Sequence, residues 1–303
     1  MTTAPLPLRF QIGARALASI QRQLIAVPLS LEDALEGRLP LLPPLDRTAH
    51  GYRVTSLPED RRDAMVYAAG GMIGFVRERY TRRFVDLATG LDAWLQSIAP
   101  ATRAALQSGT EKVASVSGGC LDIRRFRTPD EMTAFHDIAR RIALRSCQER
   151  LLGGGLPDDS TFLRGMYQRA AADSVLGWLL HIAGEPAAYL YVTVDGGIAR
   201  RDHAGHDPAF SDLRPDCVLQ LAAMRDLFAA GGLQRFDFTE GDSEHKRQFA
   251  TGGVDCIDML LLRASLANRL TTAALGALER TAALGRSATR QLGLGKIARA
   301  FRR

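Results

Sequence analysis

The sequence predicts an α/β (α+β) protein built on a mixed sheet. From residue 120 onward, apolar periods typical of strands and of helices alternate in the order β-α-α-β-β-β-α-β-α-β. Glycine and proline separate these periods. The chain has 303 residues and 46% apolar content, which suffices for one large domain or for two lobes with buried cores.

The first half of the chain is expected to be rich in strands. Four segments with apolar or alternating patterns predict them: residues 15–28, 51–56, 64–69 and 72–87. Prolines mark the irregular loops near the first of these: Pro28, Pro40, Pro43 and Pro44. A helix is expected over 91–107, and Pro100 must kink or interrupt it because proline lacks the N–H that a helix interior needs.

The second half contains a helix with a well-marked start. Thr128 supplies an N-cap, Pro129 occupies the first helical position, and Glu131 follows three residues after the cap. Together these residues predict a capping box. The helix is expected to end at the glycines of 153–155.

The other elements of the second half continue the alternation. They are a strand over 120–127, a helix over 160–172, three strands over 175–183, 187–194 and 197–203, a helix over 215–230, a strand over 234–239, a helix over 243–250 and a strand over 256–263. Turns at 184–186 and 195–197 have residues typical of tight hairpins, so the three middle strands are expected to form a meander. The strand–helix–strand order that follows predicts a crossover, which makes the sheet mixed.

The net charge of +6 is concentrated at the C-terminal end. Residues 268–303 contain eight basic residues and one acidic residue, Glu279, so this segment carries +7 and the rest of the chain sums to −1. The basic isoelectric point therefore belongs to this segment. A nucleic-acid-binding surface over the whole protein is disfavoured.

Cysteine usage and hydropathy predict a cytoplasmic protein. The cysteines stand apart, without CxxC pairs or metal-type spacing: Cys120, Cys147, Cys217 and Cys256. This pattern is typical of reduced, buried thiols, and no metal is expected. We recognise no signal-peptide pattern and no run of about 20 apolar residues, so no membrane span is expected.

The densest cluster of ionisable side chains lies between Arg214 and Gly252, where a predicted strand ends and a helix begins. It comprises Asp237, Glu240, Asp242, His245 and Lys246. Strand ends that lead into helix N-termini are where α/β proteins place ligands and chemistry. We therefore expect the functional site there.

The strand residue of this cluster, Asp237, stands between Phe236 and Phe238, so its side chain points away from both. If the phenylalanines face the core, the carboxylate must be paired or must line a site on the other face of the sheet. A structural cap of a neighbouring loop is the alternative.

The turn residues of the cluster have two interpretations each. Glu240, Asp242 and His245 are placed to take a proton from an attacking amine or hydroxyl. Helix N-capping by Asp242 or Ser243 is the alternative for that part of the turn. Lys246 lies in the first helical turn, where the helix dipole disfavours a cation, so we expect it to bind a phosphate or a carboxylate; a solvated surface lysine is the alternative.

A second cluster surrounds Gly205 at a predicted strand end. Its members are Asp202, His203, His206 and Asp207. Contact with a substrate is the expected role. A metal site is disfavoured because the His-x-x-His pair has no third distant ligand.

Several strings resemble one family. They are YLYVTVDGG from Tyr189, DHAGHDP from Asp202, RPDCVLQLAAMRDLF from Arg214 and FDFTEGDSEHKRQFATG from Phe236. They are similar to GNAT-like acetyltransferases of cellulose or exopolysaccharide synthesis (the CelD/BcsL type), a branch related to FemAB-like aminoacyltransferases with two GNAT-type lobes. The resemblance covers residues 116–263. It implies a degenerate GNAT-like lobe over 1–115, a GNAT-like acyltransferase lobe over 116–263 and a basic helical tail over 264–303.

The resemblance implies transfer of an acyl group from acetyl-CoA or another acyl-CoA to a small-molecule or saccharide acceptor, by N- or O-acetylation. The implied catalytic residues are Glu240, Asp237 and His206; the implied cofactor-binding residues are Arg214, Lys246 and Cys217; the implied substrate-binding residues are Asp202, His203, Asp242 and His245. One departure concerns the CoA pyrophosphate, which GNAT enzymes hold on a Gly-rich turn at a helix N-terminus. Here Pro215 removes an N–H and Asp216 adds negative charge, while Arg214 offers a charged contact instead.

Two other functions stay open. One is a FemAB-like aminoacyltransferase that uses aminoacyl-tRNA, the only nucleic acid expected. The other is a non-catalytic partner that docks a polysaccharide synthase at the membrane. Apolar residues at helical spacing in the tail predict contact with an anionic membrane at its inner face, and packing on the first lobe is the alternative. These residues are Leu266, Leu270, Ala274, Leu275, Leu278, Leu292, Ile297 and Phe301.

Overall fold

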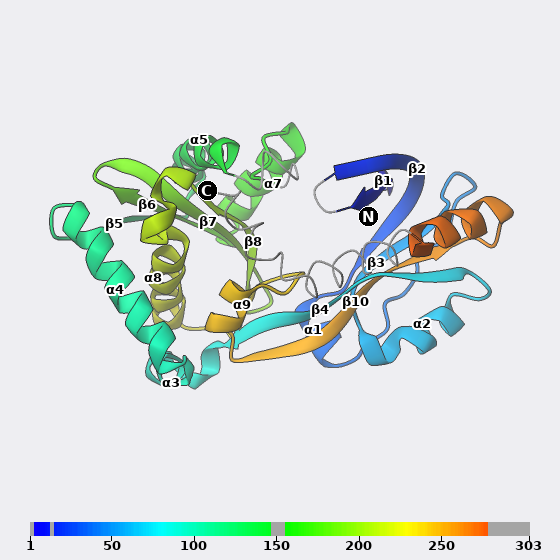
Figure 1. The fold of residues 1–303 in the computed structure, drawn as a ribbon, viewed down its shortest axis with the longest axis horizontal. Coiled ribbons are helices and arrows are strands. Elements are labelled where there is room, and N and C mark those ends of the chain that lie inside the picture. The colour runs from blue at the N-terminus through cyan, green and yellow to red at the C-terminus, as the bar shows by residue number, and fades with distance from the viewer. Residues whose placement is uncertain (1–2, 13–14, 147–154, 278–303) are drawn as a thin grey trace, which may run out of the picture. The chain divides into compact units, whose positions relative to one another are not determined.

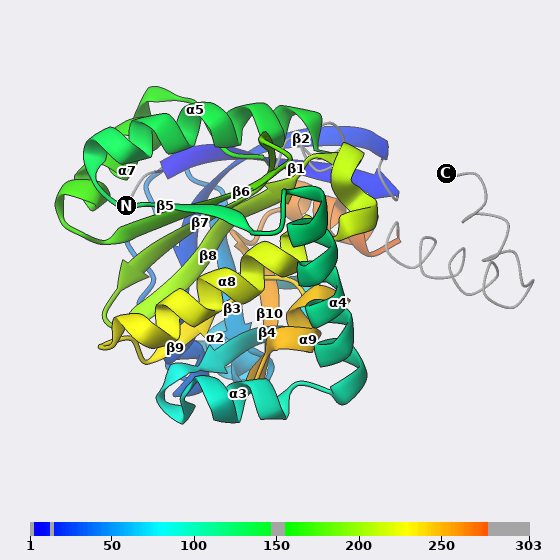
Figure 2. The ribbon, with the colours of Figure 1, turned by 90° about the vertical axis from the view of Figure 1, so that its left-hand side faces the viewer.

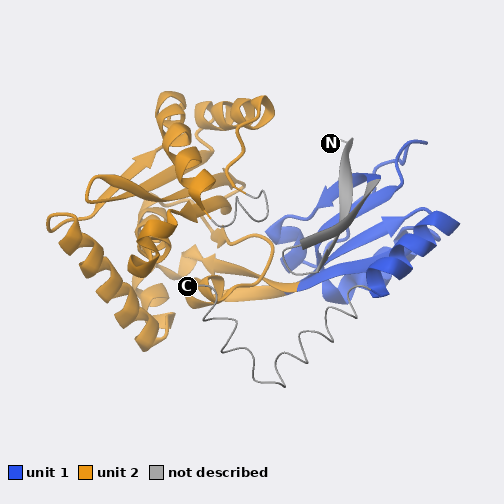
Figure 3. Ribbon diagram, turned by 45° about the horizontal axis from the view of Figure 1, so that its top comes forward, with its two compact units in different colours: residues 1–79, 255–303 blue, residues 80–254 orange. Residues whose placement is uncertain are grey.

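The computed structural model describes residues 3–12, 15–146 and 155–277 (Figure 1). They form two compact units (Figure 3): unit 1 comprises residues 1–79 and 255–303, and unit 2 comprises residues 80–254. The chain passes from unit 1 to unit 2 within strand β4 (Ile73–Asp86) and returns within strand β10 (Gly252–Leu262). The unit boundaries thus fall inside two long strands and differ from the lobe boundaries that the resemblance implies.

Unit 1 is a sheet with short helices. Strands β1 (Thr3–Ile12) and β2 (Arg15–Pro28) are antiparallel, β2 runs parallel to β3 (Gly51–Pro58), and β3 is antiparallel to β10. Helix α1 (Leu31–Leu35) follows β2, and a 3₁₀ turn (Glu59–Arg61) leads into helix α2 (Arg62–Ala68). The core of unit 1 gathers Val54, Leu57, Met65, Ile257, Met259 and Leu261.

The predicted strand over 64–69 is wrong, because these residues lie in α2. Met65, Val66 and Tyr67 have strand propensity, but the acidic residues before them favour a helix start. Only Met65 of this helix is buried, while Tyr67 is 90% exposed, so a single anchor on the core suffices for this short helix.

Unit 2 contains a mixed sheet in the order β4-β9-β8-β7-β6-β5. The strands are β5 (Asp122–Phe126), β6 (Val175–Ile182), β7 (Glu185–Asp195), β8 (Ile198–His206) and β9 (Arg235–Asp237). Only β8 and β9 are parallel; the other neighbours within the unit are antiparallel. The predicted mixed sheet, with a meander followed by a crossover, is confirmed.

Helices cover both faces of this sheet (Figure 2). On one face lie α3 (Leu91–Ser97), α4 (Pro100–Val116) and α8 (Pro215–Ala230), which pack around Trp94, Trp178 and Phe236. On the other lie α5 (Pro129–Arg145) and α7 (Ser160–Ala171), which pack around Phe135 and Tyr191. A short helix, α9 (Glu244–Phe249), follows β9.

Local signals predicted several helix ends correctly. The capping box of Thr128 and Glu131 begins α5, and Pro100 opens α4 after α3 has ended at Ser97. Helix α5 ends at Arg145; the glycines at 153 and 154, where the sequence placed its end, lie outside the described residues.

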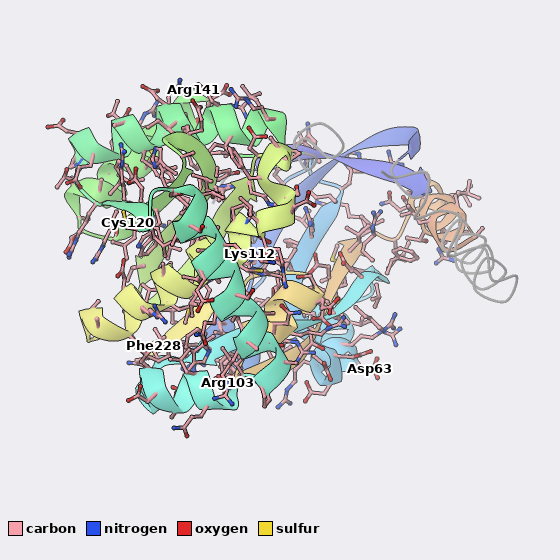
Figure 4. The ribbon with its side chains drawn as sticks, turned by 60° about the vertical axis from the view of Figure 1, so that its left-hand side comes forward. Asp63, Arg103, Lys112, Cys120, Arg141 and Phe228 are labelled. Carbon is pink, nitrogen blue, oxygen red and sulfur yellow. The ribbon has the colours of Figure 1, made fainter. Side chains whose placement is uncertain are left out.

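The surface of unit 2 is strongly charged (Figure 4). Arg103 and Lys112 lie on α4, and Arg141 lies on α5. Cys120 is exposed before β5, which corrects the expectation that every cysteine is buried; Cys217 and Cys256 are buried, and Cys147 lies outside the described residues. Phe228, which is also labelled in Figure 4, packs against Trp94 with 5.4 Å between the ring centroids.

Residues 266–277, in unit 1, are helical. Leu275 packs on Leu24, Leu260 and Leu262, whereas Leu266 and Leu270 are 75% and 63% exposed. The predicted apolar stripe is therefore divided between two faces of the helix, and its members after 277 lie outside the described residues. Among the described helices, none has the length and hydropathy that a bilayer crossing requires.

Candidate functional site

The central feature of unit 2 is the place where β8 and β9 stop pairing. The two strands pair only at 198–200 and 235–237, after which β9 ends and β8 continues beside β7 to His206. Here the β7–β8 register shifts, with Val192 opposite Arg201 and Tyr191 opposite His203, so Asp202 is an extra residue in β8. Such a bulge bends a strand and redirects its side chains. Past Arg200, the β9-facing edge of β8 therefore has no strand partner in the described chain.

A cavity of about 210 Å³ lies beside this part of β8. It is lined by Tyr189, Leu190, Arg201, Ala204, Gly205, His206, Asp216, Leu219 and Gln220, which come from β7, β8 and α8. At Gly205 a Cβ would stand 2.8 Å from Cε1 of Tyr189. Glycine at this position therefore lets the buried tyrosine ring lie against the strand.

The bulge divides the second predicted cluster between the two faces of the sheet. His203 packs against Phe162 and Tyr191 on the α5 side, and burial lowers its pKa. Asp202 accepts a hydrogen bond from Thr193 Oγ1 at 2.6 Å. His206 lines the cavity, where Nε2 lies 3.2 Å from Ser211 Oγ.

The two carboxylates of this cluster also form ion pairs. Asp202 pairs with Arg200, and Asp207 with Arg145. Asp207 also caps the 3₁₀ turn Pro208–Leu213 through the N–H of Ala209. Of this cluster, His206 alone lines the cavity.

Asp237 is engaged on both carboxylate oxygens. Arg82 donates to Oδ1 from Nε at 3.2 Å and to Oδ2 from Nη2 at 2.5 Å, and the Thr239 N–H donates to Oδ1 at 2.8 Å. Phe236 and Phe238 pack edge to face on each other and are fully buried. The contacts of Asp237 thus match the structural alternative, in which it caps the following turn.

Lys246 holds the turn after β9 together. Its Nζ donates to the carbonyl oxygens of Thr239, Glu240 and Gly241, at 3.3 Å for Thr239 and 3.0 Å for Gly241. Burial, together with the positive charge of Arg201, lowers its pKa to about 8. The ammonium group is therefore directed at the backbone.

The remaining turn residues separate into exposed and paired side chains. Glu240 is exposed. Asp242 binds Arg247 and Arg83, and these contacts, with Arg247 first, lower its pKa. Ser243 is the N-cap of α9 and accepts from the N–H of Lys246.

Three predicted residues meet at the start of α8. Arg214 is the N-cap residue, in a left-handed conformation with φ 49°, and its Nη2 lies 3.2 Å from Cys217 Sγ. Ligand atoms of Asp216, Cys217 and His245 lie within 4.8 Å of one another. The structure thus brings His245, which follows β9, close to Arg214 and Cys217 at the start of α8.

The protonated thiol of Cys217 and the positive charge around this group oppose metal binding, although the imidazole of His245 is neutral. Burial and Asp216 raise the pKa of Cys217 to about 11, so the thiol keeps its proton. Burial and Arg201 lower the pKa of His245 to about 4. Thiolate and imidazole are good ligands for zinc, but the arginines nearby add positive charge and disfavour a divalent cation.

Sequence reasoning missed Arg201 and Gln220. Both line the cavity, and Gln220 is 2% exposed with no hydrogen-bond partner for Nε2 in the described chain. A signal was present, since Gln220 interrupts the otherwise apolar string VLQLAAM on α8. A polar residue at a buried helical position calls for a partner.

A family model matches the part of the chain that carries this cavity. Residues 100–247 match the family model of the acetyltransferase (GNAT) domain. This part of the chain is thus similar to a GNAT acetyltransferase domain, and the matched residues include β8, β9 and all of the cavity-lining side chains. A search of curated proteins gave no match.

Three solved structures are similar to this chain at low identity. The C-terminal domain (DUF2156) of a candidate lysylphosphatidylglycerol synthetase from Agrobacterium fabrum has a TM-score of 0.51 and 12% identity, over 75% of this chain and 73% of that one. L-PGS from Bacillus licheniformis has a TM-score of 0.48 and 14% identity, over 74% and 71%. FemX has a TM-score of 0.48 and 12% identity, over 74% and 75%. The similarity to the first shows a shared fold.

Proposed function

We propose that the GNAT-like domain transfers an acetyl or other acyl group from acyl-CoA to the amine or hydroxyl of a small-molecule or saccharide acceptor. The observation that carries this proposal is the separation of β8 from β9 beside a cavity. A strand edge without a neighbour leaves backbone groups available to a ligand, and a thioester carbonyl bound there can accept from a backbone N–H of β8.

The reaction is a direct displacement. The acceptor nitrogen or oxygen attacks the thioester carbonyl carbon, the C–S bond breaks, and the CoA thiolate leaves and takes up a proton. We assign removal of the acceptor proton to His206, because it is the predicted catalytic residue that lines the cavity. Glu240 is exposed in the turn after β9, and Asp237 is committed to Arg82.

The start of α8 bears on the choice of donor. Pro215 has no N–H, and the N–H of Cys217 donates to the carbonyl of Arg214 at 3.0 Å. Few backbone donors are therefore left for a pyrophosphate, and Arg214 would supply the phosphate contact in their place. This local structure also favours a second candidate, an aminoacyltransferase that takes its acyl group from aminoacyl-tRNA.

The resemblance of the sequence to acetyltransferases of exopolysaccharide synthesis supports a saccharide as the acceptor. We propose on this basis a cytoplasmic enzyme that modifies a saccharide and whose basic C-terminal segment docks at the inner face of an anionic membrane. If the protein were only a non-catalytic docking partner, replacement of His206 would leave its binding to the membrane unchanged and there would be no acyl transfer to lose.

A donor panel tests the proposal. The purified full chain is exposed to CoA, acetyl-CoA, longer acyl-CoAs and aminoacyl-tRNA, and binding is read from the melting temperature and from calorimetry, since a ligand of the native state raises the melting temperature. We expect stabilisation by acyl-CoA at millimolar concentration. No shift and no heat with any CoA compound would refute the acyl-CoA donor, and a response to aminoacyl-tRNA alone would establish the second candidate.

A further inference from the structure

Two polar side chains at the cavity have donor groups available to a ligand. Gln220 is 2% exposed, and its Nε2 has no hydrogen-bond partner in the described chain. Arg201 contacts His245 Nδ1 at 3.4 Å and makes no ion pair within the described ranges. Buried polar groups are normally paired, because leaving one unpaired costs free energy. Both side chains line the same cavity, which suggests a ligand that accepts hydrogen bonds.

The surrounding charge points to an anion. Three cations act on His245, namely Arg201, Arg214 and Lys246, whereas the carboxylate acting on it is that of Asp216. Of these groups, Arg201 and Asp216 line the cavity itself. Because Arg201 forms no ion pair within the described ranges, a negative group in the cavity would be attracted to its guanidinium.

The size of the cavity limits what can enter. A volume of about 210 Å³ corresponds to roughly seven water molecules. Pockets that enclose a whole ligand usually measure about 300–1,000 Å³. The cavity therefore suits the terminal group of a substrate whose remainder lies along β8.

We propose that this cavity binds a carboxylate group of a substrate, with the Arg201 guanidinium and the Gln220 amide as donors. A guanidinium presents parallel N–H groups that match the two oxygens of a carboxylate. A phosphate is a poorer match, because the backbone donors that usually surround it are reduced by Pro215 and by the bond from Cys217 N to Arg214 O.

The carboxylate has two possible sources. It belongs either to the acyl group, as in the CoA thioester of a dicarboxylic acid, or to the acceptor. This inference rests on the proposed function only in placing acyl transfer at β8.

Binding tests the inference without turnover. Titration of the full chain by calorimetry compares succinate, its uncharged diamide succinamide, and inorganic phosphate. We expect succinate to bind at least about tenfold more tightly than either of the others. Arg201→Met should weaken succinate binding about tenfold or more, in line with loss of a charge-assisted hydrogen bond, and Arg201→Lys should restore part of it. The matched control is Arg225→Met, which changes an exposed arginine on the same helix as Gln220.

Gln220→Leu keeps the test decisive if Arg201 variants fold poorly. It removes a buried donor without a partner, so the melting temperature should stay level or rise while succinate binding weakens. Equal binding of succinate and succinamide, or unchanged succinate binding in folded Arg201→Met and Gln220→Leu, would overturn the inference.

Turnover then identifies the source. Succinyl-CoA is compared with butyryl-CoA, and amino-acid acceptors are compared with their amides. An Arg201-dependent preference for succinyl-CoA places the carboxylate on the acyl group, and one for the amino acid places it on the acceptor. Acetyl transfer without either preference would sink the inference and leave the proposed function standing. Arg201-dependent succinate binding without transfer from any thioester would support the inference and refute the proposed function.

Discussion

Arg82 and Asp237 form an ion pair inside the sheet of unit 2, with side chains 3% and 1% exposed. Arg82 lies on β4 and Asp237 on β9, which are adjacent antiparallel strands. Because Asp237 also accepts from the N–H of Thr239, the pair fixes the end of β9 and the start of the turn that Lys246 closes. The ion pair therefore joins the end of β9 to β4 at the point where β9 stops pairing with β8.

We expect Asp237→Asn to destabilise the protein by about 3–5 kcal/mol, because it removes the carboxylate charge that pairs with the buried Arg82 guanidinium. Urea unfolding measures this change. The double variant Arg82→Met/Asp237→Leu should cost less than Asp237→Asn alone, since it removes both charges. A catalytic base would behave otherwise: the single variant would unfold like the wild type and lose turnover.

Lys246 should make stability depend on alkaline pH. Its pKa is lowered from 10.5 to about 8 in the native state, so between these values the unfolded chain binds more protons than the native one. Stability should therefore rise as pH increases through this window, by at most about 1.4 kcal/mol per pH unit. The measurement is urea unfolding between pH 7.5 and 10.5, relative to Lys246→Met, which lacks the titrating group. Parallel profiles for the two proteins would show that the native pKa is not lowered.

His206→Gln should lower turnover by about 10²–10⁴-fold and leave the melting temperature nearly unchanged, because the residue lines the cavity and makes one side-chain hydrogen bond, to Ser211, in the described structure. Steady-state kinetics with acyl-CoA measure this. Glu240→Gln is the comparison, since its side chain is exposed, and we expect it to change turnover little. The reverse ranking of the two variants would transfer the role of base to Glu240.

The exposed leucines of the helix over 266–277 provide a test of membrane docking. Leu266→Ser/Leu270→Ser should weaken co-sedimentation with anionic vesicles without unfolding the protein, because both side chains face solvent. Shortening the chain after Ala277 removes most of the basic residues, each worth about 1 kcal/mol near an anionic surface, and should abolish binding at moderate salt. Leu275 must stay, since it packs on Leu24. Equal sedimentation of all three proteins, or binding to neutral vesicles, would exclude this mode of docking.

The sequence predicted the sheet of unit 2 well, because its signals are local. Each of these signals acts within a few residues: the capping box at Thr128, the hairpin turns around β7 and the proline that opens α8. The alternation of Phe236 and Phe238 about Asp237 likewise predicted a buried carboxylate that faces away from the core.

The arrangement of the site could not be predicted, because it depends on partners far along the chain. The partner of Asp237 is 155 residues away in sequence, and no local pattern around Arg82 indicates it. The bulge at Asp202 similarly separates His203 from His206 through a shift in pairing that alternation alone does not show. Arg201 lies next to the same bulge and lines the cavity, which the local sequence pattern likewise does not show.

The passage of the chain through both units has a consequence for biosynthesis. Ser56 and Asp258 bond across β3 and β10 although they are 202 positions apart, and all of unit 2 lies between them. While the ribosome makes the intervening segment, β3 exposes an edge whose eventual neighbour does not yet exist. Unit 2 can fold first, but unit 1 must wait for β10. Nascent chains arrested before residue 252 should therefore need protection from aggregation, and those arrested after the completed strand has left the exit tunnel should not.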